Sequence, residues 1–353
     1  MDSKKPLKVV SIGGGTGQSV LLRALRCLDC EITAIVAMAD DGGSTGILRK
    51  YSDIPAPGDI RKCLVSLSAD PDSLLSRCFE HRLKTVDMHA MGNLALMSVY
   101  EETGSFPQAI AACEELLGCK GHVMPSTLDL LTLHGQTCDG RHICGQAKTS
   151  HGPCTMKRVW VEPGQCKAYQ PAVDAILEAD MVVLGPGSLF TSIIPNLLVP
   201  DIAQALRVTK AVCVFVCPKS DSQGETWGMR ADEYVDALMA HGLSDSLDIV
   251  LLNKPRRKDR LSSISFKALV GDSLSEDTLN EQGYPKYRPV ICKPEEIQRI
   301  EDAGVHTVVR DFDTCIHPYQ HDVEVLSQVL KEILDCCHKV AQKSDAQNHE
   351  STQ

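Results

Sequence analysis

The feature that most constrains the fold is a short apolar run over residues 9–17 that stops abruptly at glycines. Residues 9–12 are small or apolar and rich in β-branched side chains, which predicts a buried strand. Four of the five residues 13–17 are glycine, and a helical pattern follows over 19–25. Glycine lets the backbone approach a ligand closely, and the free N–H groups at a helix start favour an anion. The stretch therefore predicts a phosphate-binding turn between a strand and a helix.

This turn differs from the two best-known phosphate motifs. No Gly-Lys-Ser/Thr follows it, so it is not a P-loop, and Gln18 interrupts the G-x-G-x-x-G spacing. The density of glycines favours a phosphate site over a purely structural turn, although one such loop does not identify a function. Its candidate phosphate-binding residues are Gly13, Gly14, Gly15, Thr16 and Gly17.

Two acidic residues follow the next predicted strand, residues 31–38. Asp40 and Asp41 stand at its end, and a second loop of glycine, serine and threonine comes next, with Ser44 as a candidate phosphate contact. Paired carboxylates beside a phosphate site favour a hard cation such as Mg²⁺, or a sugar or alcohol group. A turn capped by aspartate would explain only one of the acids. We therefore treat Asp40 and Asp41 as candidate metal ligands.

Two polar residues stand near the starts of later helices. Arg61 falls in the first turn of a helix that we expect Asp59 to cap, where a cation is unfavourable for the helix dipole. This conflict suggests that Arg61 binds an anion such as phosphate; a solvated arginine is the alternative. Asn93 follows the predicted helix start at Met91 and is either an N-cap or a ligand contact.

The opening pattern recurs in the second half of the chain. A buried strand is predicted over 179–184, and a turn rich in glycine and hydroxyl groups leads from it into a helix. Because the hydroxyl groups fall at the helix start, this turn is a second candidate phosphate site. Its candidate residues are Gly185, Gly187, Ser188 and Thr191.

Strands and helices alternate along most of the chain, which predicts a doubly wound α/β fold with a mostly parallel, Rossmann-like sheet. Residues 121–170 contain short strands and an Asp139-Gly140 hairpin signal, so we expect an antiparallel excursion there. No repeat or linker divides the chain. We predict one domain over 1–341, ending in an amphipathic helix over 322–341, and a disordered polar tail over 342–353. Further strands are predicted over 211–217, 248–253, 289–292 and 307–311.

Composition argues against several classes of protein. The 353 residues are 43% hydrophobic and 23% charged, as in a globular protein with an ample core. A net charge of −10 argues against a nucleic-acid-binding protein. No apolar stretch reaches membrane-spanning length and the first strand leaves no room for a signal peptide, so we expect a cytoplasmic protein without a membrane partner. In that reducing compartment, most of the 16 cysteines are expected to be small core residues with free thiols.

Taken together, these stretches resemble the gluconeogenesis factor family, which is related to the CofD-type 2-phospho-L-lactate transferases. The resemblance runs in family order over residues 8 to 335. It rests on residues 12–17, 39–46, 57–61, 92–94, 125–127, 184–198, 224–226 and His321-Asp322.

The resemblance implies a doubly wound fold and, for the bacterial branch, binding of UDP-sugars with roles in gluconeogenic growth and cell shape. CofD proteins use the same cleft with Mg²⁺ to move a phospholactyl group from a guanosine diphosphate donor onto a deazaflavin. By position, the resemblance implies that Thr16 contacts the diphosphate and that Asp40 and Asp41 are the acids of the cleft. It also implies that Gly187, Ser188 and Thr191 form the second phosphate loop.

The chain departs from the family pattern at three places. Gln146, residues 217–219 and Gln320 stand where the family commonly has Glu, Asn-Leu and Arg, which affects the expected sugar end of the ligand more than its phosphate end. Two functions stay open: a nucleotide-sugar-binding regulator without turnover, and a Mg²⁺-dependent transferase acting on a nucleotide diphosphate. No catalytic residue is assigned. A homo-oligomer is one alternative for the oligomeric state.

Overall fold

The computed structural model of the protein describes residues 6–42, 46, 55–149, 155–222, 224–254, 287–290, 292–314 and 319–350. Ser44, one of the predicted phosphate contacts, lies outside the described residues.

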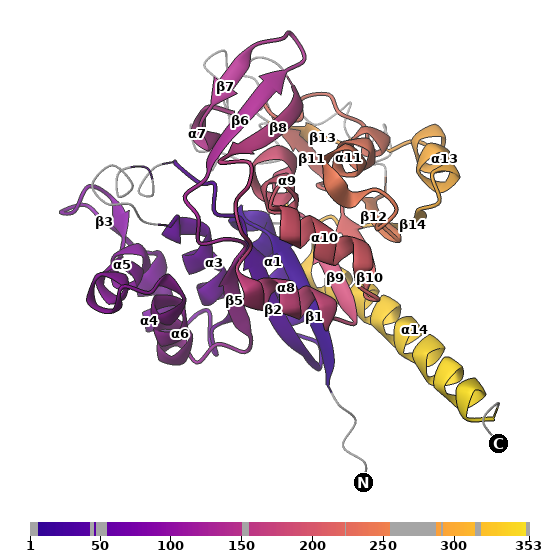
Figure 1. The fold of residues 1–353 in the computed structure, drawn as a ribbon, viewed down its shortest axis with the longest axis horizontal. Helices are drawn as coiled ribbons and strands as arrows, with labels where there is room; N and C mark the ends of the chain where they lie inside the picture. Colours follow the sequence, from indigo (N-terminus) through magenta and orange to yellow (C-terminus); the bar gives the residue numbers. More distant parts are fainter. Residues whose placement is uncertain are drawn as a thin grey trace.

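A seven-stranded parallel sheet forms the centre of the molecule (Figure 1), in the order β14-β12-β10-β9-β1-β2-β5. In chain order, β1, β2 and β5 follow one another toward one edge of the sheet, and β9, β10, β12 and β14 follow one another toward the other edge. The two strands at the centre are therefore neighbours in the sheet but far apart in the chain, which is the switch point of a doubly wound fold. The predicted fold class is confirmed. The strands are β1 (Leu7–Gly13), β2 (Cys30–Val36), β5 (His122–Pro125), β9 (Met181–Leu184), β10 (Val212–Val216), β12 (Ile249–Asn253) and β14 (His306–Arg310).

Helices cover both faces of this sheet and make two hydrophobic cores. Successive side chains of a strand point to opposite faces, so Val10 and Ile12 join one core while Val9 joins the other. The core of Val9 is closed by α1 (Gly15–Leu25), α3 (Pro57–Leu67), α4 (Leu74–Glu80), α5 (Met91–Thr103), α6 (Phe106–Leu117) and α14 (Val323–Glu350). The core of Ile12 is closed by α8 (Gln170–Leu177), η1 (Leu189–Ile193), α9 (Ile194–Leu197), α10 (Pro200–Val208), α11 (Ala231–Leu238), η2 (Met239–Leu243) and α13 (Pro294–Asp302).

A three-stranded antiparallel sheet, in the order β7-β6-β8, projects beside the main sheet (Figure 1). Its hairpin turns at Asp139-Gly140, where Gly140 adopts the left-handed backbone that this turn needs (φ 87°). The predicted antiparallel excursion is confirmed, except that β5 belongs to the parallel sheet. The strands are β6 (Thr132–Thr137), β7 (His142–Cys144) and β8 (Met156–Glu162), and the short helix α7 (Gln146–Thr149) follows β7.

Three details differ from the sequence predictions. Asp59 does not cap α3: this helix begins at Pro57, whose missing N–H suits the first helical position. The strand expected over 289–292 is β13 (Tyr287–Pro289), which pairs antiparallel with β11 (Ser220–Ser222). The last helix, predicted over 322–341, is α14, which runs from Val323 to Glu350. A further two-stranded ribbon joins β3 (Arg82–Leu83) to β4 (His89–Ala90).

Across the described residues, no single helix has both the length and the apolar character to cross a membrane. The sharply bent pair Leu189–Leu197 and Pro200–Val208 meets both measures only when its two parts are counted together.

Candidate functional site

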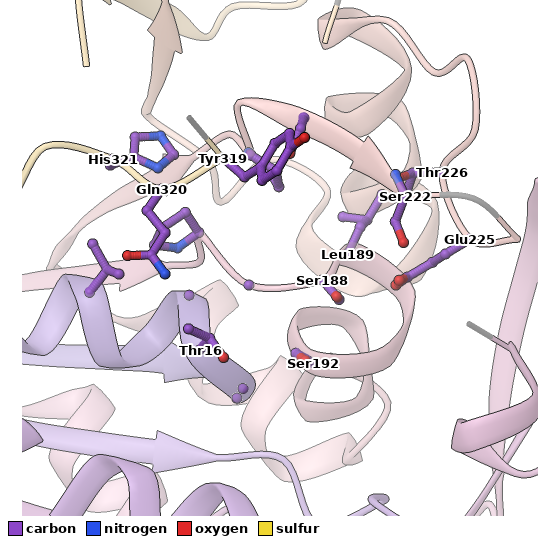
Figure 2. Close-up of a pocket in the computed structure, with 18 of the residues that line it drawn as sticks. Thr16, Ser188, Leu189, Ser192, Ser222, Glu225, Thr226, Tyr319, Gln320 and His321 are labelled. Atoms are coloured by element: carbon purple, nitrogen blue, oxygen red, sulfur yellow. The ribbon is translucent and has the colours of Figure 1, made fainter. Parts of the chain in front are cut away.

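A cavity of about 360 Å³ lies at the carboxyl ends of β1 and β9. This is the switch point of the sheet, where doubly wound proteins bind their ligands. The two glycine-rich loops, over residues 14–17 and 186–189, form one side of it (Figure 2). Residues between 218 and 226 and the segment 319–321 complete the wall.

The first glycine loop presents an open helix start to this cavity. Gly14 is the N-cap of α1, none of the described side chains caps the helix, and its first turn carries no acidic residue. The N–H groups of that turn are therefore not used by a capping side chain, which suits them to an anion. Thr16 is exposed and lines the cavity beside them.

Gln18, which breaks the familiar glycine spacing, has a structural role. Its side chain is fully buried, and its amide nitrogen donates to the Ile35 carbonyl at 3.0 Å and to the Ser11 hydroxyl at 3.2 Å. These bonds join α1 to both β1 and β2 and hold the first loop in place.

The two glycine loops touch each other through their backbones. A Cβ atom on Gly17 would lie 2.3 Å from the carbonyl oxygen of Pro186, and one on Gly187 would lie 2.9 Å from that of Gly14. Only glycine permits so close an approach at these two positions. The structure thus brings the two loops together at one cavity.

Several hydrogen-bond donors of the second loop are already bound to a carboxylate of the protein. The backbone N–H groups of Phe190 and Thr191 donate to one carboxylate oxygen of Glu225 at 2.8 and 3.0 Å. The Thr191 hydroxyl donates to the same atom at 3.2 Å. Thr191 and Gly185 do not line the cavity, whereas Gly187 and Ser188 do. The predicted phosphate contact at Thr191 therefore meets a carboxylate of the protein itself.

The two candidate metal ligands lie away from the cavity and hold backbone groups. Asp40 accepts the N–H of Gly42 at 3.1 Å. Asp41 accepts the N–H of Ala147 at 2.8 Å, and a Cβ on Gly145 would lie 2.7 Å from its second oxygen. No cluster of three His, Cys, Asp or Glu side chains suited to a metal occurs within the described ranges. In this structure both carboxylates bind backbone N–H groups outside the cavity, and their role as metal ligands stays a prediction.

Arg61 and Asn93 are buried and do not line the cavity. The guanidinium of Arg61 is 3% exposed and lies 3.5 Å from Glu80, and burial lowers its pKa while Glu80 raises it. Arg61 is therefore not the solvated arginine that the sequence left open. Gly92 makes room for it, since a Cβ there would lie 2.8 Å from the Arg61 side chain. Asn93 is not an N-cap, because α5 is capped at Ala90.

Two buried polar residues beside the cavity were noticed in the sequence only through the family pattern. His321 lines the cavity and hydrogen-bonds the Cys217 backbone, and its second ring nitrogen, Nε2, has no hydrogen-bond partner among the described residues. Burial, aided by the charge of Lys219, lowers the pKa of His321 to about 3. Lys219 donates to the Phe312 carbonyl and pairs with Asp313, each at 2.9 Å. These bonds hold the chain around Phe312 and His321 against β10.

The wall of the cavity carries many hydroxyl groups and, among the described residues, no cationic side chain. None of the described residues that line it is lysine or arginine, and the one carboxylate is that of Glu225. An anion here would be held by backbone N–H groups and hydroxyls, as in other glycine-rich phosphate sites. The hydroxyl-bearing residues are Thr16, Ser188, Ser192, Ser220, Ser222, Thr226, Tyr234 and Tyr319.

Comparison with known proteins gives matches in sequence and in fold. The family described as "2-phospho-L-lactate transferase CofD" matches residues 9–283. The chain is 41% identical to the gluconeogenesis factor of Halalkalibacterium halodurans over 307 residues, covering 86% of this chain and 89% of the relative. It is 40% identical to the gluconeogenesis factor of Bacillus subtilis over 261 residues, covering 73% and 82%. A crystal structure of a UPF0052 family member from Bacillus halodurans superimposes with a TM-score of 0.81 at 34% identity, covering 93% of this chain and 99% of that one.

Proposed function

We propose, since the chain belongs to the CofD-like family of gluconeogenesis factors, that its cavity binds a nucleotide diphosphate. The favoured ligand is a nucleotide sugar such as a UDP-sugar. The protein would act as a regulator of central carbon metabolism in the cytoplasm, affecting gluconeogenic growth and cell shape, without turning its ligand over.

The observation that carries this proposal is the uncapped start of α1, which opens into a hydroxyl-lined cavity at the switch point of the sheet. The free N–H groups and Thr16 suit a diphosphate. The remaining hydroxyls suit the neutral, donor-rich groups of a sugar or ribose. We propose Mg²⁺ only as a counter-ion carried by the diphosphate, since Asp40 and Asp41 bind backbone groups elsewhere.

Replacing Thr16 by valine tests the diphosphate site. The change keeps the shape of the side chain but removes a hydrogen bond to a charged group, so the Kd for a UDP-sugar should rise roughly 10–100-fold. Isothermal titration calorimetry, with and without Mg²⁺, measures it. Thr103→Val is the matched control, because Thr103 is exposed at the end of α5 and its hydroxyl bonds local backbone groups, the Val99 and Ser105 carbonyls and the Ser105 N–H. Unchanged affinity in Thr16→Val would contradict the proposed site.

The match to the 2-phospho-L-lactate transferase family favours a second candidate, a Mg²⁺-dependent transferase that uses the same cavity. Positioning and electrostatics dominate such transfer reactions, so one site can serve either purpose. The two candidates separate when the protein is incubated with guanosine- or uridine-diphosphate-linked donors, Mg²⁺ and a deazaflavin acceptor. We expect binding without product by chromatography and mass spectrometry. Product that disappears in Thr16→Val would replace the regulator with the enzyme.

A further inference from the structure

The carboxylate of Glu225 occupies the position where the second glycine loop would hold an anion. Two backbone N–H groups, of Phe190 and Thr191, and the Thr191 hydroxyl converge on one of its oxygens. The Ser188 hydroxyl bonds the same carboxylate. Figure 2 shows the carboxylate of Glu225 directed toward the loop that carries Ser188 and Leu189.

Burying this charged carboxylate costs free energy, because it loses its hydration. Glu225 is 1% exposed, and burial raises the pKa of its carboxyl above the ordinary value, although the hydrogen bonds from Phe190, Thr191 and Ser188 lower it. No lysine or arginine of the described chain is among the groups that stabilise its charge. A neutral glutamine of the same shape would fill the position without that penalty. A buried charge of this kind at the wall of a cavity is typical of a functional group.

We propose that Glu225 is a built-in anion for the second loop and a specificity-determining residue of the cavity. It confines ligand phosphates to the first loop, at Thr16, and reserves the half of the cavity beside Ser222 and Thr226 for neutral hydroxyl groups. The ligand preference rests on the proposed function, whereas the filled anion position stands on the hydrogen bonds alone.

Chemical rescue of Glu225→Ala tests the filled anion position. Removing the carboxylate leaves the N–H groups of Phe190 and Thr191 without their acceptor, so the melting temperature should fall roughly 3–8 °C. Acetate should restore at least half of that loss, and sodium chloride of equal ionic strength should not. Glu225→Gln is the matched control, because it fills the same volume and gains nothing from acetate. Equal acetate effects in the two variants would overturn the proposal.

Anion selectivity of Glu225→Gln gives a second test that does not depend on the stability of the alanine variant. Without the buried charge, inorganic pyrophosphate should bind about 3–10-fold tighter than to the wild type. Uridine, which carries no phosphate, should bind both proteins equally. Unchanged pyrophosphate affinity would overturn the specificity role. If acetate rescue succeeds while the wild type binds no nucleotide diphosphate, the proposed function fails and the filled anion position remains.

Discussion

Replacing Gly17 by alanine should lower the free energy of unfolding by about 3 kcal/mol and abolish ligand binding. The new methyl group would lie 2.3 Å from the Pro186 carbonyl oxygen and 2.7 Å from the Cα of Gly187. Both obstacles are backbone atoms, which cannot rotate away as the end of a flexible side chain can. The two loops must therefore separate, and the cavity between them loses its shape.

Urea unfolding and calorimetry with a UDP-sugar measure these two effects. Gly104→Ala is the control, because Gly104 has a left-handed backbone (φ 66°) with nothing within 4 Å of a new Cβ. It should cost only about 1–2 kcal/mol, from backbone strain alone, and leave binding intact. A Gly17→Ala variant no less stable than Gly104→Ala would show that the loops do not meet as described.

Acidification from pH 7.5 to 5 should cost roughly 2 kcal/mol of stability through His321 alone. Burial lowers the pKa of His321 from about 6.5 in the unfolded chain to about 3 in the folded protein. Between these values the unfolded state binds a proton that the folded state does not. The free energy of unfolding therefore falls as the pH drops below 6.5, and the loss is complete near pH 3.

His321→Asn removes this titration while it keeps a donor for the Cys217 backbone. The variant should lose less stability than the wild type between pH 7.5 and 5 by roughly 2 kcal/mol, measured by urea unfolding at each pH. His241→Asn is the comparison variant. Burial lowers the pKa of His241 too, but this residue does not line the cavity. If His321→Asn shows the full wild-type loss, the imidazole is not buried as described.

Much of the fold is determined by local pattern. The continuous run of small or apolar, largely β-branched residues over 9–12, and similar runs in the later strands, is a property of the chain itself. In the fold these strands are buried on both faces, because successive residues point to opposite cores. The glycines at 13–17 and 185–187 likewise mark both loops.

The candidate site could be predicted only in part, because several assignments depend on partners distant in the chain. Asp41, a predicted metal ligand, accepts the N–H of Ala147, 106 positions later. Arg61, a predicted phosphate contact, is buried beside Glu80 in the space that Gly92 leaves. The sequence shows that an acidic or a cationic side chain stands near a loop. It does not show which group of the folded protein lies within bonding distance of that side chain.

Local residue patterns suffice for the alternating strands and helices, the two glycine turns and the open start of α1, since each depends on residues close together in the chain. How those turns are used depends on contacts between distant parts of the folded chain. The tertiary structure presses Gly17 against Pro186, and it brings Glu225 across 34 residues to the N–H of Thr191. The physical reason is that a hydrogen bond or a backbone contact acts only over a few ångströms, and only the folded chain sets which distant groups come that close.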